Sequence, residues 1–104
     1  MLTKRTAIAK AKIFLAECNS LPFKIDRAIL FGSAINGKAK ENSDIDMALF
    51  SESFSDNILT NLDLIGAINI RFPDIDAHTY PTRFYHQQSL MMDEILRTGL
   101  EMKL

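Results

Sequence analysis

The sequence predicts an α/β (α+β) fold in which a small mixed β-sheet of three or four strands is flanked by helices. Three observations support this prediction: residues 4–18 place apolar side chains at helical spacing, residues 28–31 form an unbroken apolar run, and residues 44–50 alternate between two faces. The chain of 104 residues has room for one domain, so we expect residues 1–104 to fold as a single unit.

The first expected element is a helix over residues 4–18, which ends before Pro22. Residues 28–31 follow as a short strand that is buried on both faces, because no position in this run is polar. Gly32 ends the strand. The apolar face of the helix is made by residues three or four positions apart, namely Ile8, Ala11, Leu15 and Cys18.

Two further strands are expected. Residues 44–50 alternate in character, which places Asp44 and Asp46 on the same face of a strand. Residues 75–80 form the third strand, which Pro81 closes.

The other two expected elements are helices. Residues 55–68 begin at Ser55, a plausible N-cap, and residues 84–97 lead to Gly99, a plausible C-cap. The apolar face of the first of these helices is marked by Ile58, Leu62 and Ile65. On the second, we expect a partner-facing patch made by Met91, Met92, Leu96 and Leu100.

Composition excludes several classes of protein. The net charge is -1 and the pI is about 6.1, without the clustered basic face that an extended nucleic-acid footprint needs. No run approaches the roughly 20 apolar residues of a membrane span. The one cysteine, Cys18, can form neither an internal disulfide nor a multi-cysteine zinc site, so we expect a cytoplasmic protein.

The segment between the first two strands carries the residues suited to phosphate chemistry. Gly32 has no side chain and lets its backbone approach a phosphate, while Ser33 offers a hydroxyl and an N–H as donors. Asp44 and Asp46 lie about 6.5–7 Å apart along one strand face. Two carboxylates at this spacing suit one or two magnesium ions, which a triphosphate would help to bind.

A third carboxylate would complete such a site. Asp74, Asp76 and His78 share one face of the third expected strand. Asp76 is the better candidate because it lies within the strand, whereas Asp74 follows Pro73 at its start. We expect His78 to be a hydrogen-bonded histidine at the rim of the site rather than a metal ligand.

Gly32-Ser33, a gap of ten residues and then Asp44-x-Asp46 resemble the signature of the polymerase-beta-type nucleotidyltransferase superfamily. The stretch over residues 30–49 is most similar to the minimal nucleotidyltransferase (MNT) domains that are often encoded beside a HEPN-domain protein. Residues 94–102 resemble the usual end of that branch.

The resemblance implies a nucleotidyltransferase fold and transfer of a nucleotidyl group from an NTP to a hydroxyl, with two magnesium ions. The family suggests ATP as the NTP and AMP as the group transferred. The nucleotide-binding positions that the resemblance implies are Gly32, Ser33, Lys38 and Ser43. The catalytic and metal-binding positions are Asp44, Asp46 and Asp76. Asn36 stands where many relatives carry arginine, which weakens NTP binding or leaves that role to Lys38.

The resemblance also suggests what the acceptor and the partner are. The acceptor would be a tyrosine of a HEPN toxin, which makes this chain the antitoxin. The alternative is a catalytically weak or inactive subunit that neutralises its partner by contact. Transfer to a small molecule such as an aminoglycoside would require an acceptor-binding domain for which this chain has no obvious room. Each reading predicts a complex, with a HEPN-domain protein or with a second copy of the chain.

Overall fold

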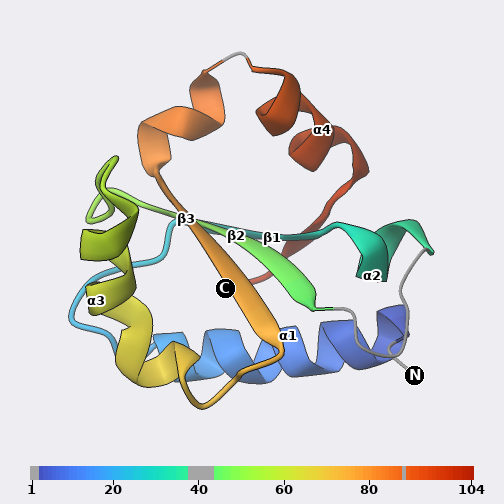
Figure 1. The fold of residues 1–104 in the computed structure, drawn as a ribbon, viewed down its shortest axis with the longest axis horizontal. Coiled ribbons are helices and arrows are strands. Elements are labelled where there is room, and N and C mark those ends of the chain that lie inside the picture. The colour runs from blue at the N-terminus through green and yellow to red at the C-terminus, as the bar shows by residue number, and fades with distance from the viewer. Residues whose placement is uncertain (1–2, 38–43, 88) are drawn as a thin grey trace.

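The computed structural model of the chain describes residues 3–37, 44–87 and 89–104. Its helices are α1 (Lys4–Cys18), α2 (Ser33–Asn36), α3 (Ile58–Asn69), the 3-10 helix η1 (Thr82–His86) and α4 (Leu90–Thr98). Its strands are β1 (Arg27–Phe31), β2 (Ile45–Ser51), β3 (Ile75–Pro81) and β4 (Leu100–Met102). The sheet is the middle layer, with α1 and α3 on one face and η1 and α4 on the other (Figure 1). No helix in the described ranges combines the length and the apolar character that a bilayer span requires.

The sheet is mixed, as the sequence predicted. Its strand order is β3-β2-β1-β4, with β1 antiparallel to both of its neighbours and β2 parallel to β3. Parallel neighbours need a crossover connection, and α3 supplies it. Strand β4 was not predicted, because a strand of three residues is too short to show a periodic pattern.

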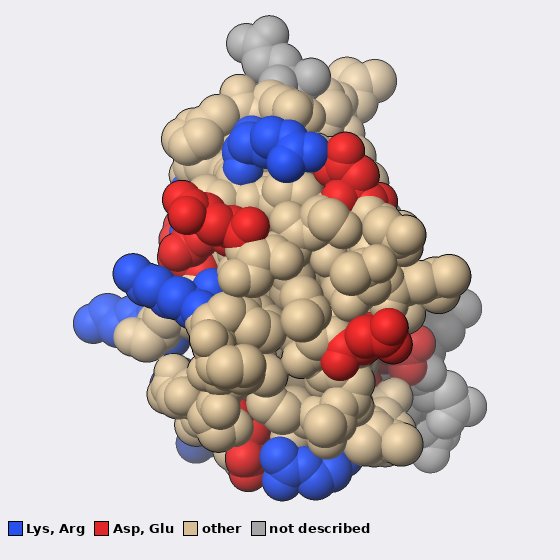
Figure 2. All heavy atoms as spheres, turned by 90° about the vertical axis from the view of Figure 1, so that its left-hand side faces the viewer, with Lys and Arg blue, Asp and Glu red and all other residues tan. Residues whose placement is uncertain are grey.

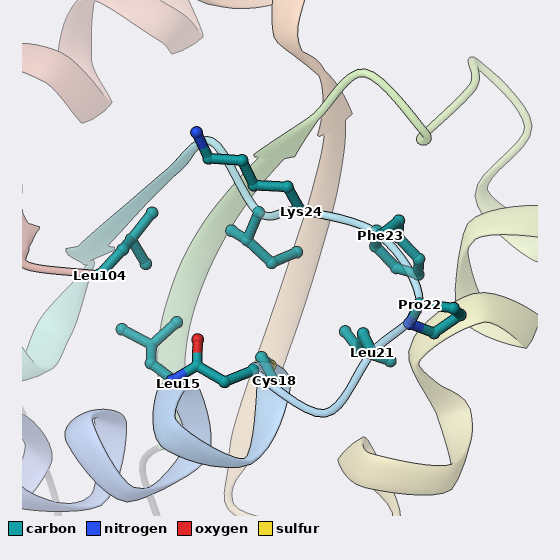
Figure 3. A pocket seen from close by; sticks show the side chains of 9 residues that line it. Leu15, Cys18, Leu21, Pro22, Phe23, Lys24 and Leu104 are labelled. Atoms are coloured by element: carbon teal, nitrogen blue, oxygen red, sulfur yellow. The ribbon is translucent and has the colours of Figure 1, made fainter.

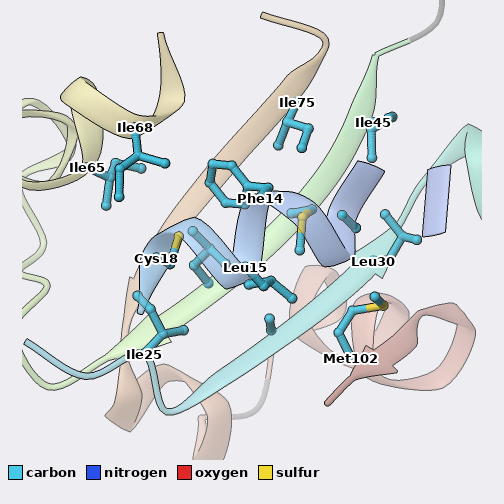
Figure 4. Packing of buried hydrophobic residues seen from close by; sticks show 14 of the residues in the cluster. Phe14, Leu15, Cys18, Ile25, Leu30, Ile45, Ile65, Ile68, Ile75 and Met102 are labelled. Atoms are coloured by element: carbon cyan, nitrogen blue, oxygen red, sulfur yellow. The ribbon is translucent and has the colours of Figure 1, made fainter. Parts of the chain in front are cut away.

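The larger core lies between the sheet and the helices α1 and α3 (Figure 4). The predicted helix over residues 4–18 is confirmed, and Ala11, Leu15 and Cys18 are buried as expected. Phe14 is fully buried in this core and meets Phe72 edge to face at 5.4 Å between ring centroids. This packing fixes α1 across the face of the sheet opposite to the candidate site.

A smaller core lies on the other face of the sheet. Phe50 of β2 is fully buried there and packs with Met92 and Ile95 of α4. The predicted partner-facing patch on the last helix is therefore wrong for Met92, which is only 2% exposed. Its neighbour Met91 remains exposed. The hydrophobic residues of α4 divide between core and surface because only one side of this helix meets the sheet.

The start and the buried face of α3 differ from the prediction. Asn57, not Ser55, is the N-cap, and its side chain accepts hydrogen bonds from the N–H groups of Leu59 and Thr60. Ile65 is buried as expected, but Ile58 and Leu62 are exposed. The helix carries apolar residues on several sides, so periodicity could not single out the face that packs inward. The buried face consists of Asn61, Ile65 and Ile68.

The predicted helix over residues 84–97 is two separate elements. The turn η1 ends at His86, and α4 begins after Ser89, whose side chain accepts a hydrogen bond from the N–H of Met92 at 3.0 Å. Gly99 is the C-cap, with extended rather than left-handed backbone. A Cβ at this position would lie 2.5 Å from a methyl carbon of Ile29, so glycine is needed for the close passage from α4 into β4.

Candidate functional site

Strand register brings two of the predicted carboxylates together. Asp46 of β2 lies directly opposite Asp76 of β3 in the parallel pair. The Nε2 atom of His78 lies 3.2 Å from Asp46 Oδ1 and 3.3 Å from Asp76 Oδ2. One ligand atom from each of these three side chains lies within 4.8 Å of the others. Two carboxylates and an imidazole at this separation form a donor set that fits a divalent cation.

Gly32, directly after the end of β1, lies against the carboxylate of Asp46 from the side opposite to β3. It follows Phe31, which pairs with Asp46 across β1 and β2. Its backbone has φ 80° and ψ -154°, a conformation that is essentially confined to glycine. A Cβ at this position would lie 2.4 Å from Asp46 Oδ2. The predicted phosphate cradle is therefore in contact with the predicted metal ligand.

Ser33 begins the short helix α2 directly after Gly32. The N–H groups of Ile35 and Asn36 bond to the carbonyl of Gly32, at 3.0 and 3.1 Å, so the chain turns tightly beside the carboxylates. Gly37 ends this helix in the left-handed conformation, with its N–H bonded to the carbonyl of Ser33. The first N–H groups of a helix have no partner within it and can bind an anion. This turn places Ser33 where a phosphate group could contact it.

The structure does not bring every predicted site residue into this group. Asp44 is exposed and precedes β2, which begins at Ile45 rather than at the predicted residue 44. Within the described ranges, Asp44 is not part of the cluster that Asp46 and Asp76 form. Lys38 and Ser43, the other predicted nucleotide-binding residues, lie outside the described residues.

Asp74 and Asp76 point to different surroundings. Asp74 pairs with Lys10 of α1, and its backbone carbonyl accepts a hydrogen bond from the N–H of Ile45 at 2.8 Å. The hydrogen bond from Lys10 lowers the pKa of Asp74. Asp76 instead adjoins His78. These contacts favour Asp76 as the third carboxylate of the site.

His78 is a hydrogen-bonded histidine at the rim of the site, as the sequence predicted. Its ring lies 5.2 Å from that of Phe31, centroid to centroid, which holds it between the two acids. Its side chain is 35% exposed, as a rim position requires. The spacing of two residues from Asp76 predicted this placement, because it puts both side chains on one strand face.

A cavity of about 220 Å³ adjoins the carboxylates along β3, lined by the run from Asp76 to Tyr80 and by Ile58 and Leu62 of α3. Tyr80 stacks on Phe50 with ring centroids 5.5 Å apart. Burial, and then the nearby charge of Asp76, raises the pKa of Tyr80, so its hydroxyl stays protonated at neutral pH.

A larger cavity, of about 580 Å³, lies at the C-terminal end of α1 (Figure 3). Leu15, Cys18, Leu21 and Phe23 are among the apolar residues that line it, and Lys24 is at its edge. Burial raises the pKa of Cys18 to about 11, which keeps the thiol protonated and unreactive. The described residues that line this cavity include no aspartate or glutamate, whereas the paired carboxylates Asp46 and Asp76 lie at the other site.

Comparison with known proteins agrees with this geometry. A family model described as "Polymerase beta, Nucleotidyltransferase" matches residues 15–102. No curated protein matches. A candidate nucleotidyltransferase from Sulfolobus solfataricus aligns with a TM-score of 0.68 and 18% identity, over 94% of this chain and 80% of that one.

Two further solved structures are toxin–antitoxin complexes. One, with AMP-PNP, aligns with a TM-score of 0.60 and 23% identity, over 90% of this chain and 70% of that one. The other, a mutant of the MntA-HpeT toxin–antitoxin, aligns with a TM-score of 0.57 and 23% identity, over 88% of this chain and 70% of that one. At these identities, the three structures establish a shared fold.

Proposed function

The chain belongs to the polymerase beta nucleotidyltransferase family, and from that premise we propose that it transfers the AMP group of ATP to a hydroxyl of a partner protein. The observation that carries this proposal is the register between β2 and β3, which sets Asp46 opposite Asp76 beside Gly32. Carboxylates from two strands can hold the metal ions of a metal-bound triphosphate, and the glycine turn can bind its phosphates from the other side.

Each group in the site has a proposed task. Gly32 and Ser33 would bind the β- and γ-phosphates, with Lys38 and Ser43 completing the nucleotide site. Asp46 and Asp76 would hold magnesium, together with Asp44 once nucleotide is bound. Magnesium, when bound, would neutralise phosphate charge and increase the acidity of the acceptor hydroxyl.

The proposed reaction balances without any further reactant. The acceptor oxygen bonds to the α-phosphorus of ATP, and the bond from that phosphorus to the bridging oxygen breaks. Pyrophosphate leaves, and the proton of the acceptor hydroxyl passes to the Asp76 carboxylate. His78, whose Nε2 lies 3.3 Å from Asp76 Oδ2, would orient that carboxylate.

We propose a tyrosine of a HEPN-domain toxin as the acceptor, which gives this chain the role of an antitoxin. The likeness to structures described as toxin–antitoxin complexes supports this proposal, and the presence of AMP-PNP in one of them supports ATP as the donor. Exposed apolar residues of α3 and of its C-cap, such as Leu64 and Ile70, are consistent with a partner subunit.

Transfer of isotopic label tests the activity. The chain, magnesium and the protein encoded by the adjacent gene are incubated with ATP labelled at the α-phosphate or at the γ-phosphate. We expect label on the partner from α-labelled ATP only, because pyrophosphate carries the γ-phosphate away. Label from γ-labelled ATP would show a kinase instead, and no label from any NTP would contradict the proposal.

A matched pair of substitutions distinguishes catalysis from neutralisation by contact. Asp46→Asn should abolish labelling and the increase in melting temperature that magnesium and ATP cause. Asp63→Asn, an exposed position of α3 away from the cluster, should preserve both. If Asp46→Asn still neutralises the partner in cells, the chain acts by binding alone.

A further inference from the structure

Strand β3 (orange in Figure 1) forms one edge of the sheet. In the described part of the chain it pairs with β2 alone. The N–H of Ile75 bonds to the carbonyl of Phe72, and the carbonyl of Ile75 accepts a hydrogen bond from Asn69. The outer backbone groups that another strand could bind therefore lie beyond Ile75 along β3. The cavity of about 220 Å³ lies beside this strand and begins at Asp76, so it is continuous with the candidate site.

Thr79 contributes an unpartnered polar group to the lining of this cavity. Its side chain is only 8% exposed, and within the described ranges its Oγ1 has no hydrogen-bond partner. Buried hydroxyls in folded proteins nearly always have a partner, because an unmet hydroxyl is destabilising. Thr79 lines the cavity, but its Oγ1 has almost no accessible surface, so a polar group bound there would supply the missing hydrogen bond once the side chain rotates toward it.

The order of the strands in the sheet places the two substrates, the nucleotide and the acceptor, on opposite sides of Asp46. Gly32 and Ser33 follow β1, Asp46 lies on β2, and Asp76 lies on β3 at the far side from the glycine turn. In phosphoryl transfer, the attacking and leaving oxygens lie roughly in line on opposite sides of the phosphorus. With the leaving phosphates at the glycine turn, the attacking hydroxyl must approach from the β3 side.

We propose that the free edge of β3 and its adjoining cavity bind the acceptor as an extended peptide segment. The segment adds to the sheet beside β3, and alternate side chains enter the cavity between β3 and the start of α3. A hydroxyl-bearing side chain of the segment then lies next to Asp76. This inference rests on the proposed function and specifies its substrate class.

The lining of the cavity favours a peptide over a nucleic acid. Ile58 and Leu62 contribute apolar surface, Asp76 contributes negative charge, and the described lining contains no lysine or arginine. A polynucleotide acceptor needs cations along its phosphates, whereas an extended peptide needs apolar contacts and backbone hydrogen bonds. The face that carries α3 shows separate groups of basic and of acidic side chains among uncharged residues, without a continuous basic surface (Figure 2).

Peptide binding can be measured apart from catalysis. The probe is a library of ten-residue peptides, each with one central tyrosine, serine or threonine between alternating apolar residues. Amide hydrogen exchange is followed with and without peptide, in the presence of magnesium and AMP-PNP. We expect the peptides that bind to slow exchange in β3, while β4, at the other edge of the sheet, is unchanged.

Adjacent residues of α3 provide a matched control. Ile58 lines the cavity and is 64% exposed, whereas Leu59 is 74% exposed and does not line it. We expect Ile58→Lys to raise the Kd for peptide about tenfold or more and Leu59→Lys to leave it unchanged. Thr79→Val should also weaken peptide binding, while the melting temperature of the free chain stays the same or rises.

The outcomes separate this inference from the proposed function. Binding of AMP-PNP with magnesium, together with failure of every peptide to protect β3, would overturn the peptide site alone. Equal effects of Ile58→Lys and Leu59→Lys on the Kd for peptide would also overturn the peptide site. The same holds if an RNA 3′ end or an aminoglycoside is labelled in preference to peptides. If the chain binds no nucleotide but still binds peptides at β3, the proposed function fails and the peptide site remains as a docking surface.

Discussion

At the scale of single residues, Gly32 shows how backbone conformation and site chemistry depend on each other. Its unusual backbone and its contact with Asp46 both exclude a side chain. The sequence predicted Gly32, Asp46 and Asp76 as site residues from their combined spacing, and the structure brings these three residues together. It also predicted His78 as a hydrogen-bonded rim residue, because the two-residue spacing puts it on the strand face of Asp76.

Replacement of Gly32 by alanine should disrupt nucleotide binding. The new Cβ would displace the Asp46 carboxylate, and the backbone would cost about 1–3 kcal/mol of strain. Gly37 also has φ 80° but nothing lies within 4 Å of a Cβ there, so Gly37→Ala should lower stability alone. Calorimetric titration with ATP and magnesium, beside thermal melting, measures both effects. Equal ATP affinity in the two variants would show that Gly32 does not position Asp46.

The Arg27–Glu101 pair predicts a dependence of stability on pH. Arg27 donates two hydrogen bonds to the Glu101 carboxylate, and these lower the pKa of Glu101 below its ordinary value of 4.5. Because the unfolded chain binds this proton more readily, the stabilisation is present above pH 4.5 and lost as pH falls through the lower, folded pKa.

We therefore expect Glu101→Gln to reduce the free energy of unfolding at pH 7, by less than about 1 kcal/mol for so exposed a pair. The difference from the native chain should vanish once the pH lies below the lowered pKa of Glu101. Urea denaturation at several pH values measures it, with Glu94→Gln of α4 as a control for an exposed carboxylate paired within one helix. A difference that persists at low pH would mean that Glu101 contributes by packing rather than charge.

At the scale of elements, the existence of the helices and strands could be predicted from the sequence more accurately than the residues at which they begin. The extent of α1 and the alternation of β2 could be predicted because one face of each is strongly apolar. The start of α3 could not, because Ser55 and Asn57 are both good N-cap residues and only two positions apart. The split between η1 and α4 was missed because local sequence favours helix on both sides of it.

The N-cap of α3 can be tested directly. Asn57→Ala should lower the free energy of unfolding by about 1 kcal/mol, because two N–H groups at the helix start lose their acceptor. Ser55→Ala should cost less, since Ser55 Oγ accepts a hydrogen bond only from the N–H of Asn57. Urea denaturation of both variants is the measurement. A larger loss of stability for Ser55→Ala than for Asn57→Ala would show that Ser55 is the N-cap, as the sequence predicted.

At the scale of the whole molecule, the mixed sheet could be predicted, but its pairing could not. Hydrophobic patterns indicate strands without saying which ones are neighbours, and β4 has too few residues to show a pattern. The meeting of Asp46 and Asp76 depends on that pairing, which links positions separated by the whole of α3. Strand alternation indicated Asp46 and Asp76 as candidates, and the family resemblance supported a shared site, but neither gave the pairing of the two strands.

Because the paired carboxylates depend on the register of β2 with β3, metal binding at the site reports whether the chain has folded correctly. A slip of one residue between these strands would turn one aspartate to the opposite face of the sheet and leave its counterpart alone. A chain misfolded in this way would still be compact and rich in secondary structure, yet it would have lost its paired carboxylates. Ion affinity would then report the fraction of molecules in native register, which circular dichroism cannot distinguish.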